Sequence, residues 1–178
     1  GTLRKTGASG EAIVRWKINN AGVIDVQNGT LSFTQTGTIG GGSTVNNGSV
    51  LHLDVGHFDL LDGGQVSGGG EFRVSTSFNV PTGTFEVNSP VRLGLDATLN
   101  GAGRIVLNGG GTVGQGYSIV SAVTDVRSRV LHTNGPVSSV INQSPRFLVS
   151  SNGILEFPDD SGSFNGDSGD TLEIAAHG

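Results

Sequence analysis

Two His-x-Asp pairs, His52 with Asp54 and His57 with Asp59, form the densest group of chemically active side chains in the sequence. Imidazole and carboxylate groups can bind a divalent metal or transfer protons. In a strand, alternate residues point to the same face and lie about 7 Å apart. A bend at Gly56 should therefore turn the two pairs toward different sides of the protein. A metal site needs converging ligands. We therefore expect these four residues to form a solvated face that serves for surface binding, with a metal or catalytic role as the alternative.

Carboxylates also gather near the end of the sequence, in PDDSGSFNGDSGD at residues 158–170. Calcium favours flexible loops rich in oxygen ligands, but the spacing does not match the EF-hand loop, which closes with a glutamate. The alternatives are a calcium site and an acidic linker. The calcium candidates are Asp159, Asp160, Asp167 and Asp170.

Glycoside hydrolysis needs two carboxylates a few ångströms apart on one wall, and the pairs Asp25–Asp54 and Asp59–Asp62 are the candidates. Two acids on a repetitive surface are also expected by chance. The chain has no cysteine, which excludes a thiol nucleophile, and it has no G-x-S-x-G elbow. We expect no enzymatic activity, no catalytic residue and no cofactor beyond the calcium candidates. A carbohydrate-active domain, either a lyase, a hydrolase or a phage tailspike fragment, is the alternative.

Charge and hydropathy weigh against two further classes of function. The net charge is −5, Lys5 and Lys17 are the only lysines, and the arginines are scattered, so no basic stripe indicates a nucleic-acid partner. No apolar run approaches the roughly 20 residues of a membrane helix. The sequence opens at GTLRKTG without a signal peptide and closes at EIAAHG, so we expect a segment of a longer protein.

A repeat organises the elements that must position these residues. A shift of about 27 residues places Ile24 on Leu51 and Leu31 on Phe58, and Asp25 then lies one turn from His52. A shift of about 33 residues aligns a third copy, and the segments IGGGSTV, VSGGGEF and LNGAGRI close successive copies. These shifts predict a turn of about 27–33 residues that contains about three short strands.

Short apolar alternation, as in Ile24-x-Val26, combines with 31 glycines to indicate many strands and tight turns. We therefore predict an all-β protein, a parallel β-solenoid (β-helix) with a less regular C-terminal capping region. An antiparallel sandwich is the alternative. Trp16, a large amphipathic aromatic residue, is expected to pack at the first coil.

The repeat weakens toward the end of the sequence, which suggests three segments. Residues 1–110 would form the solenoid coils, 111–157 irregular final coils or a β cap, and 158–178 a loop-like acidic tail. Within the second segment, RFLVSSNGILEF at 146–157 predicts a hairpin around its Asn-Gly pair.

The segments GTLRKTG at 1–7, INNAGVIDVQNGTLSF at 18–33, FNVPTGTFEV at 78–87 and ATLNGAGRIVL at 97–107 resemble secreted bacterial β-solenoid surface proteins, including autotransporter passenger regions. The run GQGYSIVSA at 114–122 is similar to one that follows the final coils in such proteins. The resemblance covers most of residues 1–122.

The resemblance implies export to the extracellular cell surface and a role in adhesion or as a structural stalk or scaffold. It carries no catalytic residues onto this chain. The expected partner is a glycan or another cell-surface molecule, and self-association is a further expectation because solenoid ends and edges invite pairing.

Overall fold

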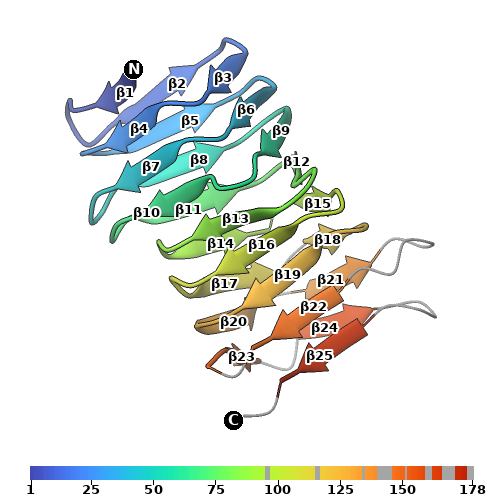
Figure 1. Cartoon of the computed structure of the whole chain (residues 1–178). Coiled ribbons are helices and arrows are strands. Elements are labelled where there is room, and N and C mark those ends of the chain that lie inside the picture. Colours follow the sequence, from blue (N-terminus) through green and yellow to red (C-terminus); the bar gives the residue numbers. More distant parts are fainter. Residues whose placement is uncertain are drawn as a thin grey trace.

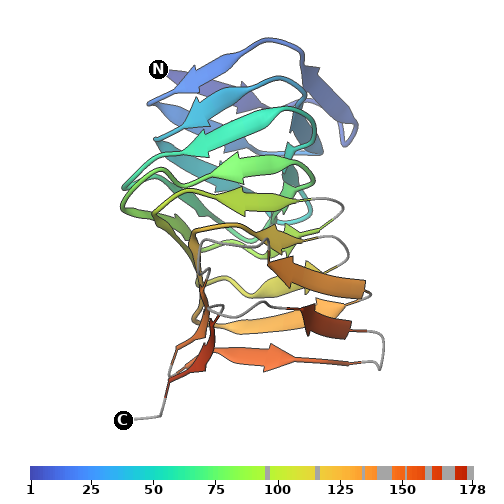
Figure 2. The ribbon, with the colours of Figure 1, turned by 90° about the vertical axis from the view of Figure 1, so that its right-hand side faces the viewer.

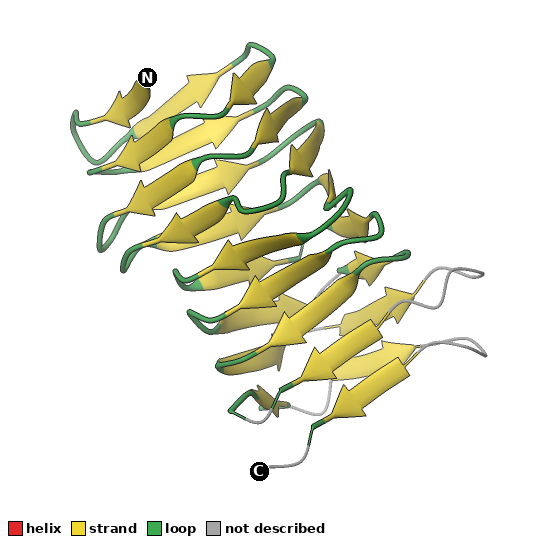
Figure 3. Cartoon of the chain, in the orientation of Figure 1, coloured by secondary structure: helices red, strands yellow, loops and turns green. Residues whose placement is uncertain are grey.

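The computed structural model describes residues 1–94, 97–114, 117–133, 135–139, 146–150, 152–158, 162–165 and 171–175. These residues form strands and loops and no helix, so no membrane-crossing helix is found among them (Figure 3). The strands stack in rows from the N-terminal end to the C-terminal end, and they build three walls (Figure 1; Figure 2). Successive strands along the chain belong to different walls, so each row of strands is one turn of a coil.

The first wall, sheet A, has nine strands within the described residues. They are β1 (Thr2–Lys5), β4 (Val23–Val26), β7 (Gly42–Val45), β10 (Gln65–Ser67), β13 (Thr84–Val87), β16 (Arg104–Leu107), β19 (Val123–Val126), β22 (Arg146–Val149) and β25 (Thr171–Ile174).

The second wall, sheet B, has eight strands within the same ranges. They are β2 (Glu11–Val14), β5 (Thr30–Phe33), β8 (Val50–Leu53), β11 (Glu71–Val74), β14 (Val91–Leu93), β17 (Gly111–Gly114), β20 (Arg129–Thr133) and β23 (Ile154–Glu156).

The third wall, sheet C, also has eight strands in the described part of the chain. They are β3 (Ile18–Asn20), β6 (Gly37–Ile39), β9 (His57–Leu60), β12 (Ser77–Asn79), β15 (Thr98–Asn100), β18 (Ser118–Ile119), β21 (Gly135–Ser139) and β24 (Gly162–Asn165).

Every strand pair in the three sheets is parallel, which confirms the parallel β-solenoid and excludes the antiparallel sandwich. The predicted turn length, however, is wrong. Leu31 pairs with Leu51, and Leu51 pairs with Phe72, so one turn of the coil takes only about 20 residues. Turns toward the C-terminal end are longer. Arg129 pairs with Ile154 and Arg146 pairs with Thr171 there, so each of these turns takes more residues.

The misleading shift arises because all three walls are built from similar short strands. Ile24 lies in β4 of sheet A, whereas Leu51 lies in β8 of sheet B. The strand that stacks on β4 is β7, and β8 is the next strand along the chain. The shift that aligns Ile24 with Leu51 is therefore one full turn plus one more strand. In the same way, Val66 of β10 and Leu99 of β15 differ by one turn and two walls. The aligned residues therefore share an inward orientation but do not stack on each other.

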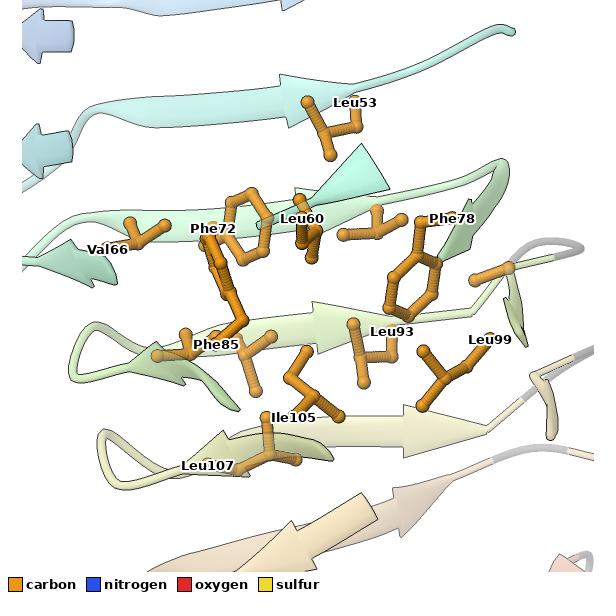
Figure 4. Packing of buried hydrophobic residues seen from close by; sticks show 14 of the residues in the cluster. Leu53, Leu60, Val66, Phe72, Phe78, Phe85, Leu93, Leu99, Ile105 and Leu107 are labelled. Atoms are coloured by element: carbon orange, nitrogen blue, oxygen red, sulfur yellow. The ribbon is translucent and has the colours of Figure 1, made fainter. Parts of the chain in front are cut away.

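Inward side chains form continuous columns along the axis. One column of sheet B contains Val14, Phe33, Leu53, Val74, Leu93, Val113 and His132. Side chains from different walls meet in the interior, as the rings of Phe72 and Phe85 do with 6.4 Å between centroids. Figure 4 shows this packing. A shared apolar interior thus holds the three sheets together.

The C-terminal segments differ from their predicted forms. β22 pairs in parallel with β19, and β23 pairs in parallel with β20, so residues 146–157 do not form a hairpin. β24 and β25 lie within 158–178, where we predicted a loop, and they extend sheets C and A. Sheets A and C therefore run through all three segments that the sequence suggested, whereas the last described strand of sheet B, β23, lies in the second segment.

Candidate binding surface

The two His-x-Asp pairs lie on adjacent walls, on either side of the corner that joins sheets B and C. His52 belongs to β8 of sheet B, and His57 and Asp59 belong to β9 of sheet C. Gly56 turns the corner with a φ of +112°, and a side chain there would crowd the backbone of Gln35 in the preceding turn. The bend separates the two pairs, as the sequence predicted.

Ser75 and Asp54 both approach the same ring nitrogen of His52. Its Nε2 lies 3.0 Å from Ser75 Oγ and 3.8 Å from Asp54 Oδ1. A catalytic triad needs the carboxylate at the other nitrogen, where it fixes the tautomer of the base. Burial lowers the pKa of His52, and Arg73 lowers it further, while Asp54 opposes this by raising it. The geometry therefore describes a partly buried polar contact between turns, and not an activated nucleophile.

His57 connects two turns of sheet C. Its Nδ1 lies 3.1 Å from Ser77 Oγ, and its Nε2 lies 3.6 Å from Asp59 Oδ1, beyond the range of a hydrogen bond. Asn79 Nδ2 donates to Asp59 Oδ1 over 2.8 Å, and Asn100 Nδ2 donates to Ser77 Oγ over 3.3 Å. The side chains of His57 and Asp59 are 45% and 37% exposed. These residues form an open polar ladder that faces solvent along sheet C.

The members of the first carboxylate pair considered for glycoside hydrolysis lie on different walls, because Asp25 belongs to β4 of sheet A and Asp54 directly follows β8 of sheet B. Asp25 pairs in register with Arg4 and Thr44, and its Oδ2 accepts a hydrogen bond from Arg4 Nε over 2.7 Å. It therefore does not stack on His52, which corrects the expectation from the sequence repeat. Asp62 Oδ1 accepts a hydrogen bond from the Thr84 amide.

Metal ligands do not converge in the part of the chain that the structure describes, where no group of three or more His, Asp or Glu side chains could hold an ion. The calcium candidates Asp159, Asp160, Asp167 and Asp170 lie outside the described residues.

Polar side chains also form contacts along the edge where sheet A turns into sheet B. Asn88 Nδ2 donates to Gln65 Oε1, and Asn108 Nδ2 donates to Asn88 Oδ1 over 2.8 Å. A shallow open hollow of about 460 Å³ lies on the same edge. Its lining is polar and consists of Gln27, Asn46, Asn47 and Gly69.

Sequence reasoning missed Asp125, a carboxylate that is fully buried although it lies on the outer face of sheet A. Its Oδ2 accepts hydrogen bonds from Arg104 Nη1 over 3.3 Å and from Arg127 Nε over 3.0 Å, and its Oδ1 accepts one from Ser150 Oγ over 2.6 Å. The cluster joins β16, β19 and the end of β22. Only the correct turn length would have placed Arg104, which pairs with Val123, beside the strand that carries Asp125.

The two amphipathic aromatics behave differently from each other. Tyr117 is fully buried, its hydroxyl lies 2.7 Å from Thr124 Oγ1, and burial raises its pKa. Trp16 was expected to pack at the first coil, but it is 80% exposed. It lies on the corner between β2 and β3, where side chains can point away from the interior.

Comparisons with protein-family models, curated proteins and solved structures give no match to this chain.

Proposed function

We propose that the chain is a structural and adhesive module of an exported bacterial surface protein. It acts outside the cell as a rigid β-solenoid that presents its outer surface to a glycan or another cell-surface partner. The observation that carries this proposal is that, within the described residues, eight or nine parallel strands stack in each wall around one interior.

Stacked turns support a rod because each turn gains its stability from its neighbours. Inward columns are constrained by packing, whereas outward positions need only stay polar, so they can be adapted to a partner. The walls also hold their outer side chains in fixed rows. His57 and Asp59 illustrate this, since they contact Ser77 and Asn79 of the next turn.

The binding face that we assign comprises sheet C and its corner with sheet B, and it includes His52, Asp54, His57 and Asp59. Its hydroxyl, amide, imidazole and carboxylate groups suit the hydroxyl-rich surface of a glycan. A sheet wall offers a long, shallow surface, which favours a polymer over a small molecule that needs a deep pocket.

An adhesion assay tests this role. Beads coated with the purified chain should bind to bacterial or host cell surfaces or to a glycan array, and the His57→Ala/Asp59→Asn double variant should bind several-fold less. A matched control is Glu86→Gln, on the outer face of sheet A. The proposal would be contradicted if both variants bound as well as the original chain, or if the original chain did not bind at all.

A parallel turnover assay separates the carbohydrate-active alternative. The purified chain is incubated with a panel of polysaccharides, and reducing ends and unsaturated products are measured. We expect binding without turnover. Turnover that falls when Asp54 or Asp59 is changed to Asn would assign catalysis to this surface and replace the adhesive role.

A further inference from the structure

Trp16 is the only tryptophan in the chain, and it stands 80% exposed at a corner of the solenoid. An indole offers one of the largest apolar surfaces of any side chain, and leaving it in water forgoes the stabilisation that burying this surface would give. Tyr117, another aromatic residue outside the strands, is instead fully buried, and Phe157, directly after β23, is 48% exposed. The exposure of Trp16 therefore calls for an explanation beyond folding.

The corner that carries Trp16 is fixed on both sides. The amide of Thr34 donates to the Val14 carbonyl over 3.1 Å, and the amide of Ile18 donates to the Thr36 carbonyl over 3.3 Å. These bonds tie the chain before and after Trp16 to the next turn. The indole is thus displayed from a backbone that is already anchored to the coil.

The register of the neighbouring strands places Gln35 at the equivalent corner position one turn away, about 4.8 Å along the axis. Val55 occupies the same corner another turn along and is 57% exposed. The corner therefore presents a ridge with an aromatic face, then an amide, then an aliphatic group. Its repeat along the axis is comparable to the length of one sugar unit in a linear glycan.

Two exposed cations flank Trp16 in the sequence, Arg15 and Lys17. Arg4 and Lys5 of the same turn have structural partners: Arg4 pairs with Asp25, and Lys5 Nζ donates to two backbone carbonyls. Among the described residues, Arg15 and Lys17 have no such ion pair or hydrogen bond. Their charges are free to meet an anionic ligand.

We infer that Trp16, Arg15 and Lys17 form a binding site for a glycan that carries carboxylates, such as a chain of uronic acid units. This inference rests on the proposed function and names the class of partner. The apolar face of one sugar stacks on the indole, carboxylates of neighbouring units pair with the two cations, and Gln35 hydrogen-bonds to hydroxyls of the next unit. Because single exposed ion pairs contribute little, affinity should grow with the number of sugar units that lie along the ridge.

Intrinsic fluorescence tests the inference directly, since Trp16 is the sole tryptophan. The purified chain is titrated with oligogalacturonate and, separately, with a neutral cello-oligosaccharide of equal length. We expect a saturable change in emission with oligogalacturonate and at least about tenfold weaker binding of the neutral sugar. Raising the ionic strength should weaken the interaction, because screening reduces the attraction between exposed charges.

Variants locate the site by calorimetry. Arg15→Gln/Lys17→Gln should weaken oligogalacturonate binding about tenfold or more, and Trp16→Ala should weaken it by a similar factor. The matched control is Arg92→Gln, which removes another exposed cation from β14 of sheet B and should leave the affinity unchanged.

Three results of the fluorescence and calorimetry measurements would overturn the inference. They are the absence of a saturable change, an equal loss of affinity in Arg92→Gln, and an emission shift that follows protein concentration without sugar, which would show that a second copy covers Trp16. The adhesion assay keeps the two proposals apart. If Trp16→Ala keeps both its adhesion and its affinity for oligogalacturonate while His57→Ala/Asp59→Asn loses adhesion, the adhesive role stands and the uronate site fails.

Discussion

At the scale of single residues, Asp125 shows how a buried charge can link successive turns of the solenoid. A buried carboxylate is costly unless hydrogen bonds and opposite charges compensate it. Arg104, Arg127 and Ser150 provide this compensation from three different turns. Asp125 therefore fastens turns together on the outside of sheet A, in addition to the apolar contacts inside.

We predict that Asp125→Ala lowers the free energy of unfolding by about 3 kcal/mol, because it leaves Ser150 and two arginines without their acceptor. Urea denaturation followed by circular dichroism measures the change. The matched control is Asp25→Ala, which breaks the pair with a more exposed Arg4 and should cost less than about 1 kcal/mol. Equal losses in the two variants would contradict the structural role of Asp125.

His52 predicts how stability depends on pH. Its pKa in the folded chain lies below the ordinary value of 6.5, mainly because burial disfavours the charged imidazole. The unfolded chain therefore binds more protons near and below pH 6.5, and the free energy of unfolding should fall as the pH drops through 6.5. Urea denaturation at several pH values measures this slope.

The substitution His52→Gln isolates that contribution, since Gln retains a polar group near Ser75 but does not titrate. We expect the stability difference between the original chain and the variant to be constant above pH 7.5 and to shift in favour of the variant below pH 6.5. A difference that stays constant across both ranges would rule out His52 as a source of acid sensitivity.

At the scale of elements, two adjacent glycines at the start of β7 differ in their surroundings, since one is closely packed against the preceding turn and the other is not. A methyl group on Gly41 would overlap the carbonyl oxygen of Gly22 in the preceding turn, whereas one on Gly42 would meet nothing within 4 Å. We predict that Gly41→Ala lowers the free energy of unfolding by about 2–3 kcal/mol. Gly42→Ala should change it by less than about 1 kcal/mol. Thermal denaturation of both variants provides the measurement, and a similar melting temperature for the two would contradict the register of β4 with β7.

The sequence predicted the strands and the inward residues of the coil but not the length of its turn. Alternation identifies an inward residue such as Leu51, because the apolar and polar faces of a strand differ in every wall. It does not identify the wall, because β4 and β8 have the same alternation. Corner glycines could not separate turns either, since each turn has several corners.

The geometry of the candidate binding surface could be predicted only in part, because the sequence did not reveal the turn length. The bend at Gly56 could be inferred locally, so the separation of the two His-x-Asp pairs was predicted correctly. Contacts between turns, such as His57 with Ser77 and Arg104 with Asp125, depend on the turn length and could not be derived. The exposure of Trp16 was also missed, because a corner lacks the alternation that indicates which side a residue faces.

At the scale of the whole molecule, stability should vary along the axis. Middle strands such as β11 and β14 have neighbours on both sides, whereas β1 and β25 each have one neighbour within the described residues. Exposed apolar side chains mark these two terminal strands, with Leu3 39% and Ile174 75% exposed. Turns stabilised by their neighbours should therefore open first at the ends.

We predict that backbone amides of β11 and β14 exchange hydrogen at least about 100-fold more slowly than those of β1 and β25. Exchange followed by mass spectrometry over a range of protein concentrations measures this gradient. Slow exchange at β1 and β25 that disappears on dilution would show that copies of the chain pair through their terminal strands, as unpaired edges allow. Slow exchange at every dilution would mean that the coil opens as one unit, because each turn would then be held too tightly by its neighbours for the ends to open separately.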